Sequence, residues 1–89
     1  YLGGVTVSES NLNSVNLARS ILTESRIEQS QLRGSNLFMT DFRNAKLVNV
    51  QLAGANLRGA DLSNTDLSQS NLQGIQMQGL KLRGVNLRG

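Results

Sequence analysis

Apolar side chains recur at every fifth position along the whole chain. From Leu2 to Leu87 all 18 such positions are apolar, and they hold 14 of the 15 leucines. Two places before each central position the residue is mainly small or β-branched, and one place before it is mostly an amide or acid. Two places after it the residue is most often Gly. The chain is therefore a tandem array of five-residue repeats.

A period of five fits neither an α-helix nor a flat strand. Five residues advance an α-helix by about 500°, so the leucines would spiral around its whole surface. On a strand they would point alternately to opposite faces, because five is odd. We infer that the backbone turns once per repeat, so that each repeat forms one side of a closed coil. The period thus predicts a β-solenoid, with glycines at corners that need positive φ, but it leaves the number of sides open.

The repeats resemble the motif of the pentapeptide-repeat family, A(D/N)LXX. Residues 55–59 (Ala-Asn-Leu-Arg-Gly) and 60–64 (Ala-Asp-Leu-Ser-Asn) match it fully, and residues 85–89, 35–37 and 70–72 are close variants. The resemblance covers the whole chain. It implies an all-β fold, a right-handed quadrilateral parallel β-helix with four repeats per coil. The chain would form about four and a half coils, roughly 20 Å long at strand spacing.

This solenoid is expected to be a single domain spanning residues 1–89. The chain begins without Met and already inside a repeat. We interpret it as a fragment of a longer protein, whose targeting information is not in view.

Grouping the repeats in fours arranges the central side chains in four ladders that we predict to form the core. The ladders are Leu22, Phe42, Leu62 and Leu82; Ile27, Leu47, Leu67 and Leu87; Leu12, Leu32, Leu52 and Leu72; and Leu17, Leu37, Leu57 and Met77. Ser and Thr occupy eight of the 17 small positions between them, and their hydroxyls need hydrogen-bond partners inside the coil.

Two columns next to the core consist only of amides. They are Asn16, Asn36, Asn56 and Gln76, and Asn11, Gln31, Gln51 and Asn71. Stacked amides can hydrogen-bond along such a column. We therefore interpret both as structural ladders, with a binding face as the alternative.

The composition removes most catalytic and metal-binding chemistry. The chain has no Cys, His, Pro or Trp, so it lacks thiolates, disulfides and the commonest metal ligand and general base. Asp41 and Asp61 would lie one coil apart, but Arg43 or Lys81 can neutralise them. We predict no catalytic residue, no cofactor and no metal site. No apolar run reaches the length of a transmembrane helix, about 20 residues, so no membrane insertion is expected and a soluble location, bacterial cytoplasm or secreted, is favoured.

The charge argues against two kinds of nucleic-acid-related function. Nine basic and six acidic residues give +3 and are spread along the chain, whereas nucleic-acid binders cluster their Lys and Arg. Some proteins of the family that the chain resembles mimic B-form DNA and bind DNA gyrase. Mimicry of DNA needs a strongly acidic surface, and the net charge of +3 disfavours it for this chain. The basic residues either solubilise the chain or form a footprint for a phosphate or an acidic partner.

The candidate partner contact consists of four residues, Phe38, Met39, Val48 and Arg58. Phe38 and Met39 occupy the outward positions of their repeat, where polar residues or Gly are usual, and Val48 is similarly placed. An exposed aromatic with aliphatic neighbours is a plausible contact. Alternatively, the stem of Arg58, one coil away, covers Phe38, or protein beyond this fragment does.

These observations favour a non-catalytic protein–protein interaction scaffold or rigid spacer within a larger bacterial protein, such as a secreted effector or a multidomain regulator. The alternative is a DNA-mimicking gyrase-binding protein, which the +3 charge disfavours, and an enzyme is least favoured. A protein partner and flanking domains are the expected partners. An end-to-end dimer through an uncapped coil is a further prediction.

Overall fold

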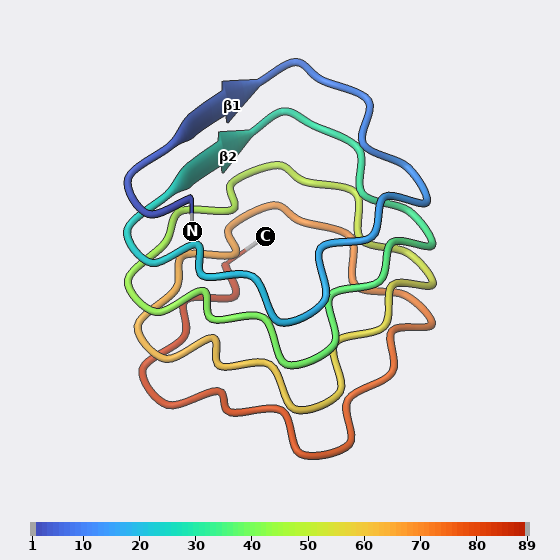
Figure 1. Cartoon of the computed structure of the whole chain (residues 1–89). Coiled ribbons are helices and arrows are strands. Elements are labelled where there is room, and N and C mark those ends of the chain that lie inside the picture. The colour runs from blue at the N-terminus through green and yellow to red at the C-terminus, as the bar shows by residue number, and fades with distance from the viewer. Residues whose placement is uncertain (1, 89) are drawn as a thin grey trace.

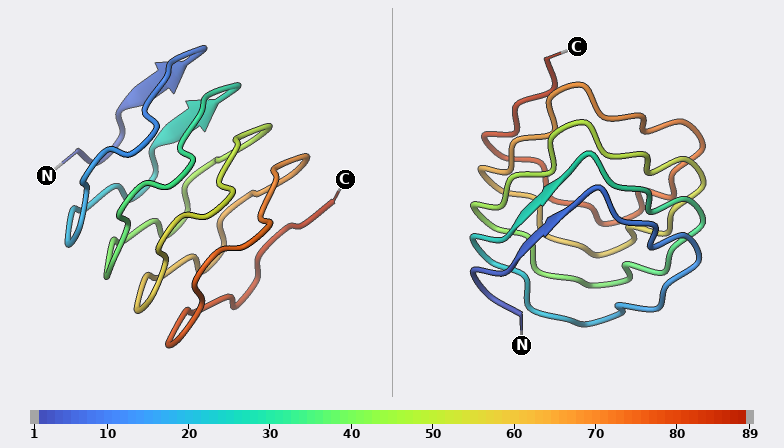
Figure 2. Two further views of the ribbon diagram at one scale, coloured as in Figure 1. Left: turned by 90° about the vertical axis from the view of Figure 1, so that its right-hand side faces the viewer. Right: turned by 90° about the horizontal axis from the view of Figure 1, so that it is seen from above.

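The chain winds into four-sided coils stacked along one axis (Figure 1). The computed structural model describes residues 2–88, and in it the two ends of the chain lie at opposite ends of the stack (Figure 2). The fold is an all-β, right-handed quadrilateral β-helix, as the resemblance implied. Its principal extents are 28 × 28 × 22 Å, and the shortest agrees with about four and a half coils at a spacing of ~4.8 Å.

Neighbouring coils pair in parallel, and each residue faces the equivalent residue four repeats further along the chain. Strand β1 (Thr6–Ser8) pairs with β2 (Arg26–Glu28) in the register Thr6↔Arg26. Elsewhere the contacts are single parallel bridges with the same offset, from Asn11↔Gln31 to Asp66↔Asn86. Within residues 2–88, β1 and β2 are the only continuous strands, because the backbone turns after every few residues.

Four of the five backbone N–H groups in a typical repeat donate to backbone carbonyls. One donates to the preceding coil, two to the following coil, and one across the corner to the preceding repeat. In repeat 35–39 these bonds are Asn36 N to Val15 O (2.9 Å), Leu37 N to Asn56 O (2.8 Å), Met39 N to Arg58 O (2.9 Å) and Ser35 N to Leu32 O (3.2 Å). The ladder therefore leaves one N–H per repeat, on the residue after the centre.

That fifth N–H is bound by the Asn or Asp side chain two residues earlier in the same repeat. Nine such bonds, of 2.9–3.2 Å, join Asn11 to Asn13, Asn16 to Ala18, Asn36 to Phe38, Asp41 to Arg43, Asn56 to Arg58, Asp61 to Ser63, Asp66 to Ser68, Asn71 to Gln73 and Asn86 to Arg88. A short side-chain oxygen reaches the N–H two residues on, as in an Asx turn.

The prediction that stacked amides bond along their columns is therefore corrected. The asparagines stabilise the backbone of their own repeat, because the unpaired N–H lies there. Gln31 does not play this part. Asn13 of the preceding coil accepts from Arg33 N (2.8 Å) and donates to Gln31 Oε1 (3.0 Å) instead.

The corners use positive φ at every repeat from residue 4 to residue 84. Seven of these corners are Gly, as the glycine positions predicted, but ten are other residues with φ of 52–63°. Gly59 is a corner where space also matters. A Cβ added there would lie 2.9 Å from Met39 Cγ, whereas one added at Gly54 meets nothing closer than Gly34 N at 4.0 Å. The missing side chain at Gly59 lets Met39 pack against the next coil.

Replacing Gly59 by Ala is expected to destabilise the protein more than replacing Gly54 by Ala. Both variants carry the cost of a Cβ at positive φ, about 1–2 kcal/mol, but only the first displaces Met39. Urea unfolding of the two single variants measures the difference. Adding Met39→Ala removes the obstructing Cγ and should abolish that difference. A difference that persists in the Met39→Ala background would contradict this explanation.

The leucine ladders form one continuous core. Their members in the middle coils are at most 2% exposed: Leu22, Ile27, Leu32, Leu37, Phe42, Leu47, Leu52, Leu57, Leu62 and Leu67. Leu72 is half-buried and packs against this core.

Met77, Leu82 and Leu87, which were predicted to be core, are 56%, 43% and 55% exposed, and this is a correction. All three belong to the last described coil, which within residues 2–88 has no further coil stacked on it. The predicted end-to-end dimer would form through an uncapped coil of this kind, and it stays a prediction.

Most buried hydroxyls donate to backbone carbonyls inside the coil. Thr40 Oγ1 donates to Leu17 O (2.9 Å), and Thr65 Oγ1 donates to Phe42 O (2.7 Å). Ser25 is the exception, because its Oγ is buried without a hydrogen-bond partner.

Candidate interaction surface

The repeats define four sides of the solenoid. Side 1 comprises residues 2–4, 20–24, 40–44, 60–64 and 80–84; side 2 comprises 5–9, 25–29, 45–49, 65–69 and 85–88; side 3 comprises 10–14, 30–34, 50–54 and 70–74; side 4 comprises 15–19, 35–39, 55–59 and 75–79. The candidate contact residues Phe38, Met39 and Arg58 lie on side 4.

Phe38 is held between arginines of the two neighbouring coils. The guanidinium carbon of Arg19 lies 5.4 Å from the ring centroid, and that of Arg58 lies 5.7 Å from it. Arg58 Nε also donates to Asn56 Oδ1 (3.2 Å). The Phe38 side chain is half-buried in this arrangement, so Arg58 does cover part of it.

Met39 next to Phe38 remains 46% exposed. Arg19 and Arg58 are exposed as well. Side 4 thus presents an aliphatic side chain beside an aromatic ring, with a cation from the coil before and another from the coil after. Such a combination suits a protein contact, because aromatic, Met and Arg side chains are enriched in interface cores.

Val48 does not belong to this surface. It lies on side 2, which faces away from side 4 in a four-sided coil, and it is half-buried. Ile21, another apolar residue in a polar position, is exposed on side 1. Arg19, in contrast, belongs to the surface but was not among the predicted contact residues. Its position almost one full coil before Phe38 is the only sequence signal that could have found it.

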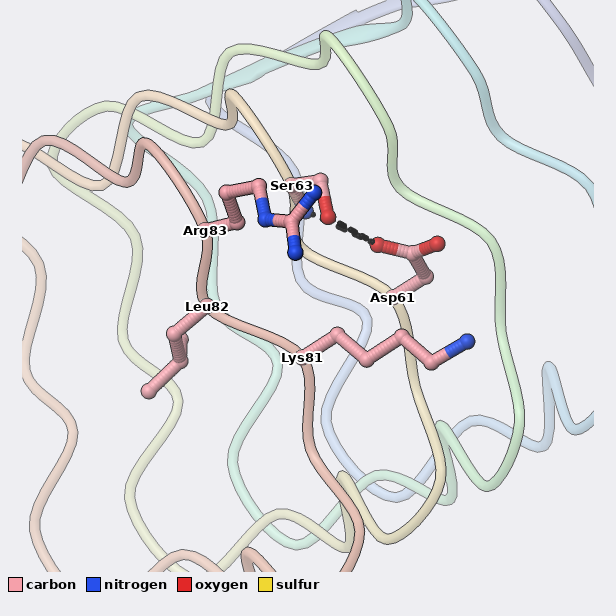
Figure 3. Close-up of a pocket in the computed structure, with 5 residues that line it drawn as sticks. All are labelled: Asp61, Ser63, Lys81, Leu82 and Arg83. Carbon is pink, nitrogen blue, oxygen red and sulfur yellow. Dashed lines mark hydrogen bonds between the residues drawn. The ribbon is translucent and has the colours of Figure 1, made fainter.

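Side 1 carries an open depression in the last two coils, with a volume of about 540 Å³. It is lined by Asp61, Ser63, Lys81, Leu82 and Arg83, and Figure 3 shows the Ser63 hydroxyl donating to Asp61. This hydrogen bond measures 2.6 Å. Leu82 contributes to the depression because its side chain is exposed in the last described coil.

Neither Asp41 nor Asp61 is suited to donate a proton near neutral pH. Hydrogen bonds from Arg43 lower the pKa of Asp41, and its two oxygens accept from Arg43 Nε (2.9 Å) and Nη2 (2.8 Å). The hydrogen bond from Ser63 is the main cause that lowers the pKa of Asp61, with a smaller contribution from the Lys81 charge. The two residues are bridge partners, but both are ionised, so they do not form an acid–base pair.

These lowered pKa values predict how stability changes with pH. A carboxyl whose pKa is lower in the folded state stabilises the fold above its ordinary value of 3.8, and this stabilisation is lost as pH falls through the folded-state pKa. The free energy of unfolding should therefore decrease as pH falls below about 3.8. Asp61→Asn keeps an acceptor for Ser63 N but does not titrate, so its unfolding free energy should converge with that of the native chain at acid pH. A pH-independent difference between the two would contradict this.

The described part of the chain has neither a metal-ligand cluster nor a membrane-spanning helix. In residues 2–88, Asp and Glu side chains do not gather in groups of three or more that could hold a metal ion. The same residues contain no helix long and apolar enough to cross a membrane.

Solved structures of two pentapeptide repeat proteins closely resemble this fold. HetL, which is involved in heterocyst differentiation regulation in the cyanobacterium Nostoc sp. strain PCC 7120, is 25% identical with a TM-score of 0.89. A protein of the Arabidopsis thaliana thylakoid lumen is 27% identical with a TM-score of 0.90. Each comparison covers 94% of this chain, but only 39% of HetL and 59% of the Arabidopsis protein. The comparison with curated proteins found no match.

The family comparison agrees with the repeat pattern. The model for pentapeptide repeats matches residues 1–37, 40–74 and 52–89, in eight copies. These matches span almost the whole chain, and the coils, their constant register and the ladder of leucines are the structural form of the same repeat. The chain belongs to the pentapeptide-repeat family.

Proposed function

We propose that this chain is a non-catalytic protein–protein interaction scaffold or rigid spacer within a larger protein, and that its contact surface lies on side 4 around Phe38 and Met39. The observation that carries the proposal is the exposed Met39 beside the arginine-flanked ring of Phe38. Phe38 and Met39 occupy outward positions of their repeat on side 4, so an aliphatic side chain is exposed beside an aromatic ring.

The coil stack supports a scaffold because it holds this surface in a fixed geometry. Phe38 N donates to Asn36 Oδ1 within the repeat, and Met39 N donates to Arg58 O of the next coil. The side chain of Leu37, which precedes them, is fully buried. Preorganised surfaces lose less conformational entropy on binding.

The carboxylates support a non-catalytic role. Asp41 is bound by Arg43 and Asp61 by Ser63, and both have lowered pKa values. The depression beside Asp61 is open to solvent and lies on side 1, whereas the contact surface lies on side 4. Catalytic sites usually enclose their substrate and hold a group with a pKa near the working pH.

A pull-down with the double variant Phe38→Ser/Met39→Ser tests this proposal. We expect proteins retained by the native chain to be lost with this variant, because the apolar part of the contact is removed. Val48→Ser is the matched control, since it removes an apolar side chain from side 2 and should retain the same proteins. Thermal unfolding verifies that each variant is folded. Retention of the same proteins by the folded double variant would contradict the contact surface.

A further inference from the structure

The charges are distributed unequally over the four sides of the solenoid. Sides 1 and 2 hold all six carboxylates together with six of the nine basic residues. Each of these two sides has three negative and three positive side chains, so its net charge is zero. Sides 3 and 4 hold no carboxylate. Their charged residues are Arg33 on side 3 and Arg19 and Arg58 on side 4. The whole formal charge of +3 therefore lies on sides 3 and 4, and side 4 carries two thirds of it.

The arginines of side 4 have no carboxylate partner within the described residues. The ion pairs of residues 2–88 are Arg26 with Glu28 (3.6 Å) and Arg43 with Asp41 (2.8 Å), which belong to sides 2 and 1. Arg19 and Arg58 instead lie over the Phe38 ring. An aromatic ring attracts a cation but does not neutralise its charge.

Both guanidinium groups retain N–H donors for a ligand. Arg58 Nε donates to Asn56 Oδ1, and this hydrogen bond holds the Arg58 side chain in place. The two terminal amino groups of Arg58 do not take part in this bond. A guanidinium group binds a carboxylate through two parallel N–H donors. Because Phe38 lies between the two groups, they form a pair of carboxylate sites with an apolar side chain in the middle.

We propose that side 4 binds an acidic segment of a partner protein, whose carboxylates pair with Arg19 and Arg58 while an apolar side chain packs on the exposed Met39 next to Phe38. This inference rests on the proposed function, and it adds the chemistry of the partner. Charge complementarity selects the partner, since side 4 is the most positive side of the solenoid and has no acidic residue to repel it. The apolar contact is supplied by Met39, which is 46% exposed.

The same surface does not suit nucleic acid. Binding of single strands relies on aromatic faces on which bases stack, and the Phe38 ring already has a cation over it from each neighbouring coil. Sides 3 and 4 together offer three arginines, whereas strong backbone binding neutralises about 6–10 phosphates. The uneven charge also opposes mimicry of DNA, which requires an acidic surface.

Fluorescence anisotropy with a labelled peptide that repeats Glu-Leu-Glu-Gly tests the proposal on the whole chain. The native protein should bind this peptide, and binding should weaken as salt is added. Arg19→Gln/Arg58→Gln should reduce the affinity at least about tenfold, because charge-assisted hydrogen bonds are lost. Lys81→Gln/Arg83→Gln removes the same charge from side 1 and should bind like the native chain. A peptide with Gln in place of Glu should not bind.

Several results would overturn the acidic partner. The first is that the Glu-Leu-Glu-Gly peptide does not bind, and the second is that its affinity is unchanged in Arg19→Gln/Arg58→Gln. The third is an equal loss of peptide affinity in both double variants, which would indicate non-specific charge attraction. Tighter binding of a single-stranded oligonucleotide than of the peptide would assign side 4 to nucleic acid instead.

The pull-down separates this inference from the proposed function. Proteins that are lost with Phe38→Ser/Met39→Ser but retained by Arg19→Gln/Arg58→Gln would leave the contact surface intact and refute the acidic partner. If neither variant loses a protein, the contact surface itself is wrong.

Discussion

Replacing Leu57 by Ala is expected to lower the free energy of unfolding by about 2–5 kcal/mol. Leu57 is fully buried, and coils lie on both sides of it, with Leu37 before it and Met77 after it in the same ladder. Their backbones are hydrogen-bonded to that of Leu57's coil, so they cannot move together to fill the cavity. Urea denaturation monitored by far-ultraviolet circular dichroism measures the loss.

Met77→Ala is the matched control in the same ladder. Its side chain is 56% exposed, so its truncation removes little buried area and should change the unfolding free energy by less than about 1 kcal/mol. Equal losses in the two variants would show that the last described coil is as well buried as the middle ones, contrary to the structure.

Replacing Ser25 by Ala is expected to raise the free energy of unfolding by about 1–3 kcal/mol, the cost of burying an unsatisfied polar group. The Ser25 Oγ is such a group, because it is buried without a hydrogen-bond partner. The next residue in its column, Ala45, is already Ala and is fully packed in the core. Removing the hydroxyl therefore removes a penalty without creating a sizeable cavity. Thermal and urea unfolding measure the gain.

Ser35→Ala is the control for the opposite sign. Ser35 occupies the same position of its repeat and is also buried, but its Oγ donates to Leu32 O (2.7 Å). Its loss should lower stability by about 0.5–1.5 kcal/mol. A stabilising effect in both variants would mean that the hydrogen bond is irrelevant and that Ala is simply preferred at this position.

Much of the fold could be predicted from the sequence because the repeat is nearly unbroken. A leucine at every fifth residue requires a backbone that turns once per repeat, whatever the number of sides. The number of sides came from the resemblance to the pentapeptide-repeat motif, since nothing in a period of five distinguishes a coil of three sides from one of four.

The part of the fold that was predicted incorrectly concerns hydrogen bonding. The Asn and Asp positions are obvious in the sequence, but a column of amides suggests bonds along the stack. The structure shows bonds within each repeat instead, such as Asn36 Oδ1 to Phe38 N. That outcome depends on which N–H the backbone ladder leaves unpaired, and only the folded backbone determines this.

The candidate surface was predicted in part. Phe38 and Met39 stand out because they occupy outward positions that are otherwise polar or Gly, and Arg58 follows from its place one coil further along the chain. Val48 stands out for the same reason as Phe38 but lies on side 2. Arg19 was missed because it belongs to the corner column of Met39, and it reaches Phe38 through the direction of a long side chain.

The sequence by itself determined the repeat, the solenoid and the residues that point inward, because apolar side chains five residues apart share one axis only if the backbone turns once per repeat. It also determined the net charge of +3 and the absence of Cys and His. Only the tertiary structure decided which charges share a side, which hydroxyl is left without a partner, and which arginines meet at Phe38. These properties arise between residues of neighbouring coils, far apart in the chain, and they depend on side-chain directions that a one-dimensional pattern does not contain.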